Sequence, residues 1–135
     1  MDFDIGMAKC ATREQIEERA DALFYEAGFE ATSFANIAEA VGISRGNFYH
    51  HFKSKDDILD AVISRRLAAT QTMLENWEAE ASPEARIISF VRILIQNRAK
   101  IMAYGCPVGT LNSELAKLDH IGASRAAEIF GLFRD

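Results

Sequence analysis

The chain has 135 residues, of which 49% are hydrophobic and 26% are charged. These values are typical of one soluble globular domain, or of two small helical units that share a core. The formal net charge of −5 argues against a protein coated with nucleic acid along its whole length, but it allows a local basic patch. The longest apolar run, Ile87 to Ile95, is interrupted by Arg92 and is too short to cross a bilayer.

The cysteines and the N-terminus indicate a cellular compartment. Cys10 and Cys106 lie far apart and form no CxxC motif, so we predict no secreted disulfide framework. A reducing cytosol fits this pattern best. The N-terminus has Asp2 and Asp4 and no apolar run, unlike a signal peptide. We therefore expect a soluble, cytoplasmic protein with no membrane partner.

Helical periodicity extends over nearly the whole chain, and no strand pattern is present. The first predicted helix starts at the capping residue Thr12 and ends at Gly28. A second, short amphipathic helix follows. Ser44 caps a third helix, whose Phe48 and Phe52 we expect to face inward.

Similar signals predict the remaining helices. Ser33 and Ser54 are the predicted caps of the second helix and of a long fourth helix, which ends near Ala81. Pro83, at a first helical position, begins a fifth helix that Gly105 closes. The last predicted elements are a turn at 106–109 and helices over 110–118 and 121–134.

The block from Thr32 to Lys55 has the design of a helix-turn-helix, in which a second helix enters the major groove of DNA. Two short helices flank a tight turn that contains Gly42. The second of these helices begins with Arg45, Gly46 and Asn47, which are small or polar and can approach base edges. Arginine pairs with guanine, and asparagine with adenine, through two hydrogen bonds each.

Groups suited to DNA phosphates follow these residues. Tyr49 and His50 have polar tips, and Lys53 and Lys55 flank the motif. The helix that Ser54 caps presents amide groups that, with Lys55, would form an anion site. No acidic residue lies between positions 43 and 55. We therefore predict a local basic surface for DNA.

The segment from Ala31 to Lys55 resembles the DNA-binding motif of the TetR family of regulators, chiefly in its Phe-Tyr-X-X-Phe-X-X-Lys pattern. The stretches 23–29 and 105–111 are similar to that family as well. The resemblance extends from about Thr12 to about Leu118. It implies an all-α homodimer, usually a repressor, in which an N-terminal three-helix DNA-binding domain is joined by a long fourth helix to a helical bundle domain that binds an inducer.

The resemblance implies residue roles and domain bounds. Inducer binding moves the fourth helix in this family and so changes the spacing of the recognition helices. We expect a DNA-binding domain at 9–69 and a ligand-binding and dimerisation domain at 70–135, incomplete because members of the family are usually longer. Phosphate contacts would fall on Thr32, Ser44, Tyr49, His50 and Lys55, and base contacts on Arg45, Gly46 and Asn47.

Two features of the second half leave alternatives open. Large side chains at helical spacing fit either a plain core or an apolar inducer pocket. The candidates for such a pocket are Trp77, Phe90, Leu94, Met102 and Tyr104. Cys106 lies at a helix start, which favours a reactive thiolate, and similar cysteines in the family sense oxidants or electrophiles. The alternative is a small residue that packs the turn.

Other function classes have weaker support. Adjacent residues on a helix point about 100° apart, so His50 and His51 predict no metal site. Phosphate loops and nucleophile sets are missing, so we expect neither an enzyme nor a cofactor. We expect a ligand-responsive repressor that binds a palindromic operator. The rival is a helical small-molecule-binding protein with a remnant helix-turn-helix, against which Arg45, Lys53 and Lys55 argue.

Overall fold

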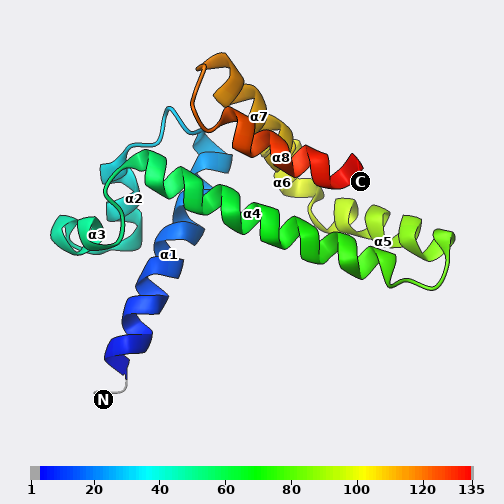
Figure 1. The fold of residues 1–135 in the computed structure, drawn as a ribbon, viewed down its shortest axis with the longest axis horizontal. Coiled ribbons are helices and arrows are strands. Elements are labelled where there is room, and N and C mark those ends of the chain that lie inside the picture. Colours follow the sequence, from blue (N-terminus) through cyan, green and yellow to red (C-terminus); the bar gives the residue numbers. More distant parts are fainter. Residues whose placement is uncertain (1–3, 135) are drawn as a thin grey trace. The chain divides into compact units, whose positions relative to one another are not determined.

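The computed structural model describes the backbone of residues 4–134 and the side chains of residues 12–133. Within those ranges it contains eight α-helices and no strand, so the predicted all-α fold is confirmed (Figure 1). The helices are α1 (Asp4–Ala27), α2 (Phe34–Val41), α3 (Arg45–His51), α4 (Lys55–Glu78), α5 (Pro83–Gln96), α6 (Arg98–Tyr104), α7 (Pro107–Lys117) and α8 (Ala123–Arg134).

The chain forms two compact units, and the boundary between them lies inside α4. The first unit ends at Ile63 and the second begins at Ser64. The sequence placed this boundary a few residues later, after position 69. No described helix is both long enough and apolar enough to span a bilayer.

The first unit is organised around one apolar core. In α1, Ile16, Ala20 and Phe24 recur every four residues, which places them on one helical face, and all three are buried. The core also takes in residues from α2 to α4, namely Ile37, Ala38, Phe48, Phe52, Ile58, Leu59, Val62 and Ile63. The predicted inward orientation of Phe48 and Phe52 is therefore confirmed.

Local capping fixes where the short helices begin and end. Ser33 caps α2 in a reciprocal arrangement, since its hydroxyl accepts from the Asn36 amide while the Asn36 side chain accepts from the Ser33 amide. Gly42 then ends α2 with a φ of 81°, a conformation that glycine adopts without steric cost. The Ser44 hydroxyl accepts from the Asn47 amide and starts α3. All three predicted signals are confirmed.

Four predicted helix boundaries are wrong. Helix α1 already begins at Asp4, so Thr12 lies inside it and is not its cap. Helix α4 ends at Glu78 rather than near Ala81. The predicted fifth helix is divided at Asn97, whose side-chain amide donates to the Ile93 carbonyl and competes with the backbone for it.

The fourth error concerns the turn predicted at 106–109. Helix α7 begins there, at Pro107, because proline has a φ suited to a first helical position and needs no hydrogen-bond acceptor. Cys106 is its cap, and the Cys106 sulfur accepts from the Gly109 amide at 3.4 Å. The last helix is confirmed over Ala123–Arg134.

The second unit has a smaller fully buried core than the first. Leu111 and Leu115 of α7 pack with Ala126 and Ile129 of α8, and all four are buried. Helix α5 has no buried residue, and most of its large apolar side chains are about half exposed. The fully buried core of this unit is thus concentrated between α7 and α8.

The core of the first unit gives a stability prediction. Ile58→Ala should lower the free energy of unfolding by about 2–5 kcal/mol, because Ile58 is 0% exposed and its loss leaves a cavity. Ile121→Ala removes the same atoms from a side chain that is 88% exposed, and it should change the free energy of unfolding by less than about 0.5 kcal/mol. Urea unfolding followed by circular dichroism measures both. Equal effects would contradict the described core.

Candidate nucleic-acid interface

Helix α3 presents its first turn to solvent. Arg45, Gly46 and Asn47 are all exposed, directly after the cap at Ser44. Within the described residues, no hydrogen-bond partner engages the Arg45 guanidinium or the Asn47 side-chain amide. A Cβ added at Gly46 would meet no atom within 4 Å other than those of its chain neighbours and of the backbone of its own helix, so the backbone there is open to an approaching surface. The structure therefore brings together the three residues predicted to contact bases.

An aromatic cluster holds α3 in place. Phe48 is 0% exposed, and its ring meets that of Phe34 edge-on with centroids 4.4 Å apart. The Tyr49 ring stacks on the same Phe34 ring, with centroids 4.9 Å apart. Tyr49 remains 48% exposed, so its ring is supported by protein while part of the side chain faces solvent. His50 is exposed beside it.

Thr32, for which the resemblance implies a phosphate contact, has its side chain inside the protein. Its side chain is 2% exposed, and its hydroxyl donates to the Gly28 carbonyl at 2.7 Å, near the end of α1. The exposed hydroxyl in this segment belongs to Ser33, which the sequence analysis considered only as a cap. Because its oxygen accepts from the Asn36 amide, the Ser33 hydroxyl hydrogen can donate to an anion at the α2 N-terminus. The capping pattern was the signal for this site.

The two lysines have partners inside the protein. The Lys53 ammonium donates to the Tyr49 carbonyl at 2.7 Å, near the end of α3. The half-buried Lys55 ammonium donates to the Phe29 carbonyl at 2.6 Å and lies 4.0 Å from the centre of the Phe29 ring. Lys55 thus ties the first turn of α4 to the loop after α1. An ammonium group has three donors, so each lysine has hydrogens left for a phosphate.

Arg13 is a contributor that the sequence analysis missed. Its guanidinium donates to the His51 carbonyl at 3.2 Å and lies 4.5 Å from the centre of the Phe52 ring. It also pairs with Glu17 on its own helix, with N and O atoms 3.5 Å apart. A cation at a helix C-terminus satisfies a free carbonyl and opposes the helix dipole. Arg13 therefore fastens the end of α3 to α1, over a sequence separation that no local pattern reveals.

The amino-acid sequence is similar to those of known regulatory proteins. A family model described as bacterial regulatory proteins, tetR family, matches residues 16–62. An uncharacterized HTH-type transcriptional regulator in the lacX 3′ region of Lactococcus lactis subsp. lactis is 33% identical over 80% of this chain and 57% of its own length. The HTH-type transcriptional repressor DhaR of Mycobacterium sp. (strain GP1) is 25% identical over 92% of this chain and 62% of its own length.

A solved structure agrees with the relatives. A transcriptional regulator (TerR/AcrR family) from Aquifex aeolicus VF5 is similar with a TM-score of 0.54 and 29% identity, covering 88% of this chain and 70% of that one. Residues 16–62 therefore match the TetR family. The chain spans about three fifths of the length of the two curated relatives named above. TetR proteins are regulators, in agreement with the expectation that the chain is not an enzyme.

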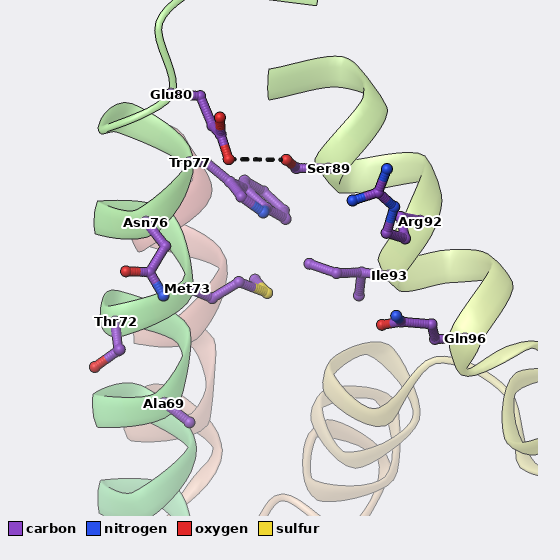
Figure 2. Close-up of a pocket in the computed structure, with 10 residues that line it drawn as sticks. All are labelled: Ala69, Thr72, Met73, Asn76, Trp77, Glu80, Ser89, Arg92, Ile93 and Gln96. Atoms are coloured by element: carbon purple, nitrogen blue, oxygen red, sulfur yellow. Dashed lines mark hydrogen bonds between the residues drawn. The ribbon is translucent and has the colours of Figure 1, made fainter. Parts of the chain in front are cut away.

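The remaining predicted site residues lie in the second unit. Trp77 lines a cavity between α4 and α5 (Figure 2). Phe90 does not line this cavity, but its ring meets that of Trp77 edge-on, with centroids 5.5 Å apart. The other three pocket candidates, Leu94, Met102 and Tyr104, do not line this cavity and are exposed. Cys106 is a free, exposed thiol at the α7 cap.

Arg13 gives a prediction for the TetR-type domain. Arg13→Gln should lower the free energy of unfolding by about 0.5–1 kcal/mol, because a hydrogen bond and a cation–π contact of a half-exposed side chain are lost. Amide exchange in the last turn of α3 should become faster. Arg19→Gln removes the same charge from an exposed position on α1 and is the matched control. Identical exchange in both variants would refute the fastening role.

Proposed function

We propose that this chain is a sequence-specific DNA-binding transcriptional regulator that represses transcription by occupying a palindromic operator as a homodimer. The observation that carries the proposal is the exposed, unpaired first turn of α3, with Arg45 and Asn47 on a helix fixed by buried aromatic rings. The description of the relative DhaR as a repressor supports the sign of regulation. The cytoplasm is the compartment that we propose.

The interface separates base contacts from phosphate contacts. Arg45 and Asn47 would hydrogen-bond to base edges in the major groove, where Gly46 lets the backbone approach closely. Phosphates would bind at Tyr49, His50, the Ser44 cap and the Ser33 hydroxyl at the start of α2. In a dimer, the two α3 helices would enter successive major-groove faces about 34–36 Å apart.

Ligand response would act through a shift of populations. Helix α4 begins in the DNA-binding unit and continues into the second unit, so a ligand held by α4 can bias the orientation of the DNA-binding unit. In one of the two states, the spacing of the recognition helices does not fit the DNA half-sites. An inducer that binds this state more tightly lowers the affinity for DNA, at most by the difference between its affinities for the two states. We therefore propose that the cavity between α4 and α5 is the inducer site.

The rival is a ligand-binding protein in which the helix-turn-helix no longer contacts DNA. Against it stands the exposed Arg45 and Asn47 pair, since a structural remnant has no need for unpaired base-contacting groups. Selection of bound DNA from a random pool distinguishes the two. A two-fold-symmetric consensus supports the regulator, and the absence of any retained DNA at low salt supports the rival.

Base and phosphate contacts should respond differently to substitution. Asn47→Ala should weaken binding to the selected site by about 1–3 kcal/mol and relax the preference at one base position, because a base-specific pair is lost. His50→Ala should weaken binding to all sequences alike, because only a phosphate contact is lost. Gel-shift titrations of both variants measure these effects.

The outcome that contradicts this assignment is specific. If Asn47→Ala weakened selected and unrelated DNA equally, Asn47 would not contact a base. Glu39→Ala, at an exposed position on α2 outside the proposed contacts, is the control and should leave the sequence preference unchanged.

A further inference from the structure

We propose that the cavity between α4 and α5 binds a small aromatic carboxylate, with Trp77 against the ring and Arg92 paired with the acid group. This inference rests on the proposed function in one respect, namely that the bound carboxylate is the inducer. The cavity lies wholly within the second unit and has a volume of about 440 Å³. That volume is within the range of about 300–1,000 Å³ that is typical of small-molecule sites.

The cavity has an apolar interior made by both helices. Met73 and Trp77 project from α4 toward Ile93 of α5, and the space between them is visible in Figure 2. All three side chains are partly exposed, so they retain apolar surface that a ligand can cover. Burial of such surface is the general driving force for binding an apolar body.

Trp77 favours an aromatic body over an aliphatic chain. Phe90 meets the indole edge-on, with an angle of 86° between the ring planes, and supports it from α5. A supported indole with exposed surface can stack with, or meet edge-on, the ring of a ligand. Met73 lies beside it, and a thioether makes favourable contacts with aromatic rings.

Arg92 determines the charge of the ligand. It lines the cavity from α5, and no hydrogen-bonding or ionic partner engages its guanidinium within the described residues. The acidic group of the cavity, Glu80, already accepts a hydrogen bond from the Ser89 hydroxyl at 3.4 Å, as Figure 2 shows. The Arg92 guanidinium is therefore the lining group that is available to an anionic ligand. A guanidinium binds a carboxylate through two parallel hydrogen bonds.

The test uses 3-phenylpropanoate as the probe and its neutral amide, 3-phenylpropanamide, as the matched compound. Trp77 is the single tryptophan of the chain, so its fluorescence reports directly on the cavity. Titration of the full chain without DNA should give saturable quenching by the acid, with an affinity about tenfold higher than that of the amide. Calorimetry provides the same affinities without the fluorophore.

Two variants assign the difference to one side chain. Arg92→Gln should bind the acid about tenfold more weakly and the amide unchanged, because only the acid pairs with the guanidinium. Arg98→Gln removes an equal charge from an exposed position on α6, outside the cavity, and should bind the acid as the unaltered chain does. Both positions are exposed, so both variants should fold, which circular dichroism checks.

Three results would overturn the inference. They are no saturable quenching at millimolar acid, equal affinities for acid and amide, and tighter binding of the cation 3-phenylpropylamine, which would pair with Glu80. The titration contains no DNA, so it tests the carboxylate site separately from the proposed regulator. If the chain retained no DNA but bound the acid through Arg92, the proposed regulator would be refuted and the carboxylate site would still be supported. Release of retained DNA by the acid would support both.

Discussion

Burial of Phe48 is the interaction on which the proposed DNA-binding surface depends. Helix α3 is only seven residues long, too short to be stable alone, so its position comes from packing. The Phe48 ring is fully buried and meets Phe34 of α2 edge-on, and Phe52 is buried four residues later on the same face. Because Phe48 and Phe52 turn inward, the residues around them are left on the outer surface. A rigid helix presented in this way loses little entropy when it binds a groove.

Basic side chains of the motif contribute to this rigidity as well as to its charge. Lys53 and Arg13 both donate to carbonyls near the end of α3, and Lys55 donates to the carbonyl of Phe29 before α2. Helix C-termini leave carbonyls unpaired, and cations stabilise them. The same side chains keep donors for phosphates. In this chain the basic cluster therefore gives internal support to α3, and part of its proposed effect on DNA binding is indirect.

The second unit has a different balance of interactions. Its buried core lies between α7 and α8, whereas α4 and α5 are joined by edge contacts, among them the Trp77–Phe90 ring pair and a bond from Arg86 to the Glu78 carbonyl. Two helices that are joined by few contacts leave room between them. That room is the cavity, and the regulatory site that we propose therefore follows from incomplete packing of two amphipathic helices.

The sequence alone determined the helical class, the helix-turn-helix and its exposed first turn, because periodicity, serine caps and the glycine at position 42 are local signals. It did not determine the burial of Thr32, the attachment of Arg13 to His51 or the residues of the cavity. Each of these depends on which side chains meet across long sequence separations. These long-range contacts are determined by the packing of the helices, and a local sequence pattern contains no information about them.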